Sequence, residues 1–183
     1  MPQGGCCHRW GLFYFTPAGR LMLMKLPFDH KKITGRFGTL SAYRKANGMQ
    51  PHSGVDFAIP VGTAIPALAN GTITIADFSK VLGNVTELRI MAYDPAGDGK
   101  EKELFYIGYA HNKAEGLAVG TKVKEGDTIC FSGNSGSASS GPHSHITVSK
   151  QHKGVYGPTS VKQDLIEFVK FNQAMDKRDK AAK

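Results

Sequence analysis

The sequence contains few cysteines, and their arrangement excludes a fold held together by disulfides. There are three in 183 residues, and two of them are adjacent, at Cys6 and Cys7. This odd number supplies no disulfide framework of the kind that stabilises small secreted domains. The third, Cys130, lies between two apolar residues and is expected to be a small core residue. Stability must therefore come from packing or from a bound metal.

Long hydrophobic runs are also absent. The longest apolar stretch near the start, Trp10 to Phe15, is far shorter than the ~20 residues that a helix needs to cross a bilayer. It follows a single arginine, stops at Thr16-Pro17 and has no cleavage site of small residues, so it lacks the form of a secretory signal. We expect no membrane span and no export by the ordinary route. A start at Met22 or Met24 is an alternative, because recognisable patterning begins only at about Lys25.

Acidic residues are nearly missing from the first 51 positions. This segment holds eight lysines and arginines against Asp29 alone, whereas the rest of the chain is close to neutral. A basic segment attracts polyanions, so nucleic acid, anionic lipid and an anionic cell wall are candidate partners; a solvated basic surface is the simpler interpretation. A nucleic-acid binder is disfavoured, because no readout element and no basic strand with interleaved aromatic residues is recognisable. We expect residues 1–24 to form a basic N-terminal extension.

What the chain does have is a composition suited to a folded core, with 40% hydrophobic and 21% charged residues. Its middle is a series of short strands separated by glycine, proline and asparagine. Alternation or apolar enrichment predicts strands at Thr72–Ile75, Val85–Ala92, Leu104–Ala110, Thr128–Ser132 and Ser144–Ser149. Turn residues occur at 94–99 and 125–127. Only Asp164 to Met175 has apolar residues three and four apart, which predicts one terminal helix. The expected fold class is mainly β.

Two histidines follow a stretch of small residues, Ser132 to Pro142. Because side chains alternate along a strand, His143 and His145 would share one face, while Ile146 and Val148 would point to the other, into the core. The two imidazoles would then be fixed on a rigid element, and the small residues beside them would leave room for a ligand. Two incidental surface histidines are the alternative interpretation.

A second cluster pairs His52 with Asp56, four residues later. Pro51 and Gly54 oppose a helix, so the segment is expected to be a turn that enters a strand from Val55 to Ile59. Imidazole and carboxylate are both ordinary zinc ligands, although the pair alone is weak evidence. A further histidine, His111, ends the strand that begins at Leu104, a place where a single histidine is usually structural.

Together these features have a recognisable order. His52-x-x-x-Asp56, then Tyr109-x-His111, then Gly141-Pro142-His143-x-His145 resembles the lysostaphin and LytM type of zinc endopeptidases, which cut peptide bonds in bacterial peptidoglycan. The resemblance runs roughly from Ile33 to Pro158. Further similar segments are Ile33–Gly38, Phe57–Thr63, Ala69–Gly71, Gly83–Asn84 and Val123–Asp127.

The resemblance implies a largely antiparallel β-sheet that forms a groove, with one Zn²⁺ per chain on its floor. Carried over residue by residue, His52, Asp56 and His145 would bind the zinc, and His111 and His143 would serve catalysis. Three protein ligands leave one position open, as expected for a catalytic rather than a structural zinc. The chain has no His-Glu-x-x-His segment, so a histidine must take the proton; which of His111 and His143 does so stays open.

Three positions depart from the family's pattern, one of them Gly157, which stands before Pro158 where an acidic residue or asparagine is common. Ser144 stands where a large apolar residue is usual and is expected to weaken the packing behind the ligand strand. Asn112 follows His111 where leucine is usual and is expected to alter the wall of the groove. These departures bear on specificity more than on metal binding.

The expected organisation is a zinc peptidase domain over residues 25–160 and a C-terminal helix with a charged tail over 161–183. We expect a monomeric peptidoglycan hydrolase that acts on the cell wall, in the periplasm or outside the cell. An origin in a phage, with synthesis in the host cytoplasm, would explain the missing signal; a bacterial enzyme is the alternative. A non-catalytic relative that binds wall or activates an amidase would normally lack ligands. The sequence does not predict which peptidoglycan bond is cut.

Overall fold

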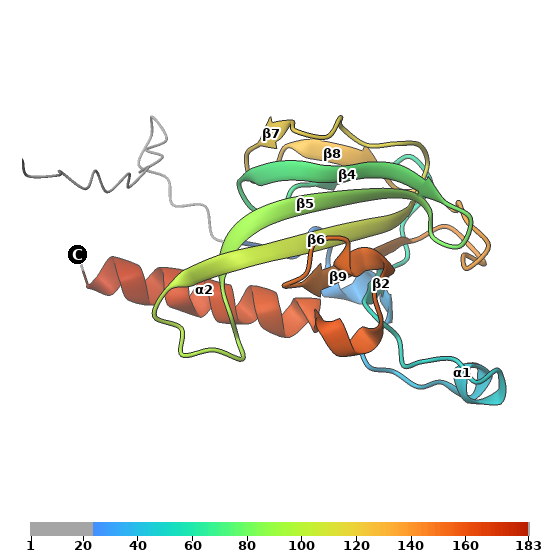
Figure 1. The fold of residues 1–183 in the computed structure, drawn as a ribbon, viewed down its shortest axis with the longest axis horizontal. Helices are drawn as coiled ribbons and strands as arrows, with labels where there is room; N and C mark the ends of the chain where they lie inside the picture. The colour runs from blue at the N-terminus through green and yellow to red at the C-terminus, as the bar shows by residue number, and fades with distance from the viewer. Residues whose placement is uncertain (1–23, 183) are drawn as a thin grey trace, which may run out of the picture.

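The strands predicted from alternation assemble into one large antiparallel sheet (Figure 1). The computed structural model describes residues 24–182. The strands are β1 (Ile33–Gly35), β2 (Val55–Phe57), β3 (Ala64–Pro66), β4 (Gly71–Ser79), β5 (Gly83–Tyr93), β6 (Lys102–Asn112), β7 (Lys122–Val123), β8 (Thr128–Phe131), β9 (Ser144–Ser149) and β10 (Lys162–Gln163). The helices are α1 (Ala42–Ala46) and α2 (Leu165–Ala181), and the short 3₁₀ turns are η1 (His30–Lys32), η2 (Gly154–Tyr156) and η3 (Thr159–Val161).

The main sheet has the order β1-β2-β9-β6-β5-β4-β7, with β10 paired to β9, while β3 and β8 form a separate pair. Every pairing among these strands is antiparallel. The prediction of a mainly β, largely antiparallel fold with a C-terminal helix is confirmed. β9 has the predicted bounds, whereas β4, β5 and β6 extend past theirs because tight turns let the hairpins continue pairing.

The turn at 94–99 shows how the sequence closes the longest hairpin. The Asp94 side chain accepts the Ala96 N–H (3.0 Å), and its carbonyl accepts the Gly97 N–H (3.1 Å). Gly99 adopts a φ of 64°, which glycine reaches without strain. This turn joins β5 and β6, each 11 residues long, so the two central strands stay in register over most of their length.

The core lies on one face of the sheet, where alternate residues of the central strands are buried. Val55 and Ile146 face each other across β2 and β9 with no exposure, and Phe105 on β6 packs against Phe168 of α2 with ring centroids 4.8 Å apart. Cys130 is buried in this core, as predicted, and so is Met24. The strand expected from Val55 to Ile59 is shorter and ends at Phe57.

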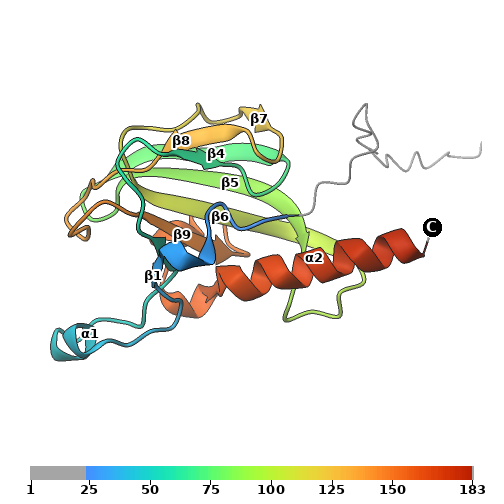
Figure 2. The ribbon, with the colours of Figure 1, turned by 180° about the vertical axis from the view of Figure 1, so that it is seen from behind.

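α2 runs along one side of the sheet, and its C-terminal end projects past it (Figures 1 and 2). It begins where the sequence predicts, with the Asp164 side chain accepting the Ile166 N–H at 2.7 Å as an N-cap. It continues beyond the predicted end at Met175, because the charged tail consists largely of good helix formers. Arg178 also anchors the last turns by donating to the Gly99 carbonyl (2.9 Å).

The segment between β1 and β2 carries α1 and projects from the body of the fold (Figure 2). Within residues 24–182, no helix is both long and apolar enough to cross a membrane. Apart from Met24, the predicted extension at 1–24, with Cys6 and Cys7, lies outside the described residues.

Candidate metal centre

The register between β2 and β9 places Asp56 directly opposite His145. Their neighbours Val55 and Ile146 point into the core, so alternation turns Asp56 and His145 to the other face of the sheet. There the Nδ1 atom of His145 lies 2.7 Å from Oδ1 of Asp56. Burial of Val55 and Ile146 in the core thus fixes the direction in which Asp56 and His145 point.

His52 reaches the same carboxylate from the turn that precedes β2. Its Nε2 atom lies 3.1 Å from Oδ2 of Asp56 and 3.1 Å from Nδ1 of His145. The turn is closed by two backbone hydrogen bonds: His52 N–H donates to the Thr39 carbonyl (2.9 Å), and Gly38 N–H donates to the His52 carbonyl (2.8 Å). His52 and Asp56 therefore meet through a turn and a strand rather than a helix, as predicted.

His111 arrives from the other neighbour of β9, by way of a β-bulge. Thr86 pairs with Tyr109 and Asn84 with Asn112, so β6 has one residue more than β5 between these pairs. His111 takes a φ of 63°, in the left-handed region that few non-glycine residues adopt. Strict alternation from the buried Tyr109 would direct His111 to the core; the bulge turns it to the face that carries Asp56.

His143 lies immediately before β9, in an isolated bridge with Gly133. Its Nε2 atom lies 3.8 Å from Oδ1 of Asp56, the oxygen that His145 also approaches. Its ring centroid is 4.7 Å from that of His111. The structure therefore brings together all five residues that the sequence singles out.

Backbone carbonyls determine which nitrogen three of these histidines present. A carbonyl can only accept, so the Nδ1–H of His52 donates to the Arg36 carbonyl (3.0 Å), that of His111 to Ser135 (2.8 Å) and that of His143 to Gly141 (2.8 Å). Each neutral ring then offers Nε2 as an acceptor. Neighbouring carbonyl groups therefore determine which nitrogen of each ring is free to accept.

The electrostatics of the centre favour an ionised Asp56 beside neutral His145 and His111. Burial raises the pKa of Asp56, but its close imidazole neighbours, with the hydrogen bond to His145 first among them, outweigh this effect and hold the pKa well below its usual range. Burial lowers the pKa of His145 to about 4 and also lowers that of His111. These protonation states at neutral pH are the ones that metal ligands require.

The donor atoms fit a metal ion. Among residues 24–182, His52, Asp56 and His145 are the one group whose ligand atoms all lie within 4.8 Å of one another. With its Nδ1 protonated, His52 directs a lone pair at the Oδ2 atom of Asp56, only 3.1 Å away. Two acceptors at this distance repel unless a cation lies between them. Two imidazole nitrogens and a carboxylate oxygen suit a borderline divalent metal.

The two unusual residues near the centre are both buried. Ser144 is fully buried, and its hydroxyl has no hydrogen-bond partner in the part of the chain that the structure describes. Asn112 donates to the Tyr109 carbonyl (3.0 Å) and to the Thr86 hydroxyl (3.3 Å). The bulge turns Asn112 inward, so it supports the strand beneath His111 instead of lining an exposed wall.

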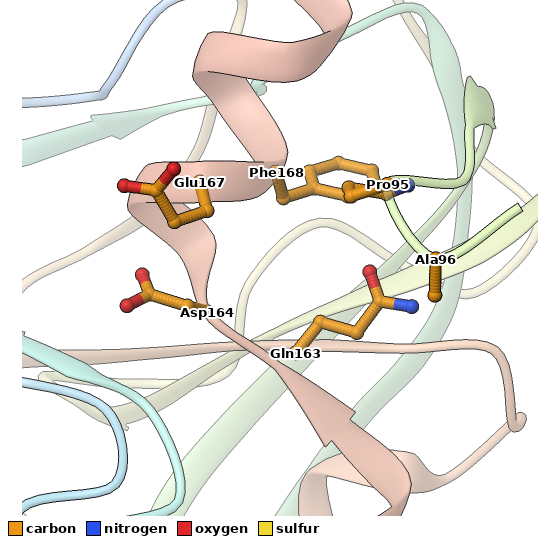
Figure 3. Close-up of a pocket in the computed structure, with 6 residues that line it drawn as sticks. All are labelled: Pro95, Ala96, Gln163, Asp164, Glu167 and Phe168. Atoms are coloured by element: carbon orange, nitrogen blue, oxygen red, sulfur yellow. The ribbon is translucent and has the colours of Figure 1, made fainter. Parts of the chain in front are cut away.

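A shallow pocket lies elsewhere, between the turn at 94–99 and the start of α2 (Figure 3). Its acidic residues are Asp164, which already caps α2, and Glu167, which pairs with Lys170 at 2.9 Å. Its lining includes no histidine. The pocket therefore offers no chemistry comparable with the cluster around Asp56.

The sequence missed two features of the centre. The bulge at His111 has no signal in an alternation pattern, since the pattern assumes regular pairing. Gly35 was singled out only as part of a similar segment, yet a Cβ atom there would lie 2.4 Å from Oδ2 of Asp56. A glycine in a strand pattern can mark such a close approach.

Comparisons with known proteins find related peptidases. A family described as Peptidase family M23 matches residues 50–156. A protein of Buchnera aphidicola named an uncharacterized metalloprotease is 32% identical over 160 residues, which cover 82% of this chain and 39% of that protein. The peptidoglycan DD-endopeptidase ShyC of Vibrio cholerae is 25% identical over 135 residues, covering 72% of this chain and 28% of ShyC. The chain thus spans about two fifths or less of the length of these relatives.

Among solved structures, the catalytic domain of lysostaphin from Staphylococcus simulans is similar. It has a TM-score of 0.57 and 27% identity, over 76% of this chain and 92% of that domain. This similarity confirms the resemblance drawn from the sequence and the fold class that it implied.

Proposed function

The chain belongs to peptidase family M23, and we propose that it is a zinc-dependent endopeptidase that hydrolyses peptide bonds in bacterial peptidoglycan. The observation that carries this proposal is the convergence of four histidines on one partly buried carboxylate. Relatives named peptidoglycan endopeptidases support the substrate class. We place the action of the protein at the bacterial cell wall, whether it comes from a phage or from a bacterium.

We assign His52, Asp56 and His145 as the ligands of one zinc ion. The three donors come from a single chain, so a monomer can hold the metal without a second subunit. A zinc ion bound there supplies Lewis acidity, which polarises a carbonyl group and makes water more acidic. The depressed pKa of Asp56 and of His145 keeps the carboxylate ionised and the imidazole neutral, so that each has a lone pair for the metal.

His111 and His143 are proposed to handle the proton and the developing charge. Their Nε2 atoms are the free acceptors, because each Nδ1–H donates to a carbonyl. Burial keeps His111 neutral at pH 7, the form that accepts a proton from an attacking water. The imidazolium formed at either Nε2 can then return its proton to the departing amine. The two rings are near enough to act on one peptide group.

The test is the release of soluble fragments from purified peptidoglycan. We expect a suspension to clear with the zinc-loaded chain, to stop clearing after a chelator is added, and to resume when zinc is restored. Mass spectrometry of fragments from glycine-bridged and from directly cross-linked peptidoglycan identifies the bond. Binding to walls without any fragment release by the zinc-loaded chain would support the non-catalytic alternative and overturn the proposal.

A further inference from the structure

We propose that Ser135 is a positioning residue that sets the orientation of His111; this inference rests on the proposed function of that histidine. Ser135 lies in the stretch of small residues before β9, a segment whose composition alone suggests a linker. Its carbonyl accepts the Nδ1–H of His111 at 2.8 Å. The position of this carbonyl depends on what holds Ser135 in place.

The side chain of Ser135 ties the residue to both strands beside the bulge. Its hydroxyl donates to the carbonyl of Asn112 on β6 (2.6 Å) and accepts the N–H of Asn84 on β5 (3.0 Å). Asn112 is the residue after His111. The Ser135 carbonyl that accepts from the imidazole is therefore held by the same short stretch of main chain that carries the imidazole. The Ser135 hydroxyl thereby holds the loop against the end of β6, where His111 lies.

The packing around this hydroxyl is close. Gly83 adopts a φ of 68°, and a Cβ atom there would lie 2.1 Å from the Ser135 hydroxyl oxygen. A side chain at Gly83 would therefore push Ser135 off its partners. The β4–β5 turn also holds the loop through its main chain, since Lys80 and Val81 carbonyls accept the N–H groups of Ser137 and Ala138 (2.9 and 3.0 Å).

His111 needs such a lock more than the other histidines do. It sits at a bulge with a left-handed backbone, so regular strand pairing does not aim its side chain. If the ring turned over about the Cβ–Cγ bond, Nδ1 would exchange places with Cδ2 and Nε2 with Cε1, so the free acceptor would face away from the centre. Misplacing a catalytic group by about 1 Å can lower a rate by ~100-fold.

The experiment compares Ser135→Ala with Ser140→Ala, an exposed serine of the same loop. In Ser135→Ala we expect kcat on a short peptide substrate to fall ~10-fold or more, with KM and zinc content unchanged. In the metal-free protein, ¹⁵N shifts of the His111 ring, assigned from the spectrum of His111→Gln, should change from Nδ1–H alone to a mixture of tautomers. Ser140→Ala should match the wild type in every measurement.

The ring shifts report on the positioning of His111 even if the chain cleaves no peptide, so the failure of this inference is distinguishable from the failure of the proposed function. Unchanged His111 shifts in Ser135→Ala would overturn the inference, and so would a fall in kcat that occurs only with loss of zinc. If Ser135→Ala does not give folded protein, Gly83→Ala tests the same contact from β5, with the same expected change in the ring shifts; wild-type shifts there would also overturn it.

Discussion

His145 and His111 approach the same centre from neighbouring strands, but different structural devices aim their side chains. His145 lies in regular β2–β9 pairing, opposite Asp56 and between residues that are buried in the core. His111 lies at a bulge, and His143 at an isolated bridge before β9. Two of the three proposed metal ligands are thus fixed by sheet register, whereas both histidines of the proton-transfer side depend on local loops and backbone carbonyls. Substitutions on the two sides should fail in different ways.

The largest effect is expected on the metal side. In His145→Ala one of three ligands is lost, so zinc measured by elemental analysis should collapse together with activity and with some thermal stability. His30→Ala, which removes an exposed histidine, should keep zinc and activity. Full zinc occupancy in His145→Ala would remove this residue from the ligand set.

The proton-transfer side should respond with a smaller and cleaner loss. In His143→Ala and His111→Ala the three ligands persist, so zinc should stay near one per chain while turnover falls by ~100-fold or more. Single-turnover kinetics and metal content measured on the same samples check this. Metal loss in His143→Ala would break the division between the two sides, and near-normal activity in His111→Ala would exclude that histidine from the mechanism.

The sequence predicted the directions of His143 and His145 but not that of His111, for a physical reason. Alternation along Ser144–Ser149 has a fixed period, so the common direction of His143 and His145 followed from the spacing. Asp56 was singled out by its spacing from His52, and its role as a ligand came from the family resemblance. The direction of His111 could not be predicted, since alternation aligns it with the buried Tyr109 and only the bulge reverses it. Its assignment came from the family resemblance alone.

Contacts between segments that are far apart in the sequence could not be predicted either. The carbonyl groups of Arg36, Ser135 and Gly141 fix three imidazoles, yet a main-chain acceptor leaves no residue-type signal. The extension of α2 to Ala181 was missed because the tail lacks the apolar periodicity used to recognise a helix.

A further substitution tests how closely the metal side is packed. In Gly35→Ala the added Cβ atom would lie 2.4 Å from Oδ2 of Asp56, so the carboxylate must shift. Substitutions of residues that contact metal ligands typically lower metal affinity by ~10–100-fold, and we expect zinc affinity to fall by about this factor. Competition with a chromogenic chelator measures it.

The matched control is Thr34→Ala, the exposed neighbour on the same strand, which should bind zinc like the wild type. Unaltered zinc affinity in Gly35→Ala would show that β1 can move away from Asp56. The metal side would then be less rigid than its regular sheet register implies.

The smallest effect concerns a second carboxylate on the same face of the sheet, which, unlike Asp56, is fully buried. Glu87 lies opposite Gly108, which lies opposite Thr147, two residues along β9 from His145. Asp56 has two close imidazole partners, but Glu87 has a histidine at 3.6 Å, and its Oε2 atom has no hydrogen-bond partner among residues 24–182. Burial therefore raises the pKa of Glu87, against hydrogen bonds from the Lys153 N–H and the Thr74 hydroxyl.

This raised pKa gives the substitution Glu87→Gln a definite sign. The folded state holds the Glu87 proton more tightly than the unfolded state, so the stabilisation is complete below pH 4.5, the ordinary value, and is lost as the pH rises through the raised pKa. Glu87→Gln keeps an acceptor for Lys153 and Thr74 without the charge, so its Tm should exceed that of the wild type by a few degrees at pH 8 and should match it near pH 4. Differential scanning calorimetry across this range checks the prediction, with the exposed Glu101→Gln as the control that shows no such trend. A Tm difference that does not vary with pH would mean that Glu87 carries no buried charge, and the contrast between the two carboxylates would then rest on Asp56 alone.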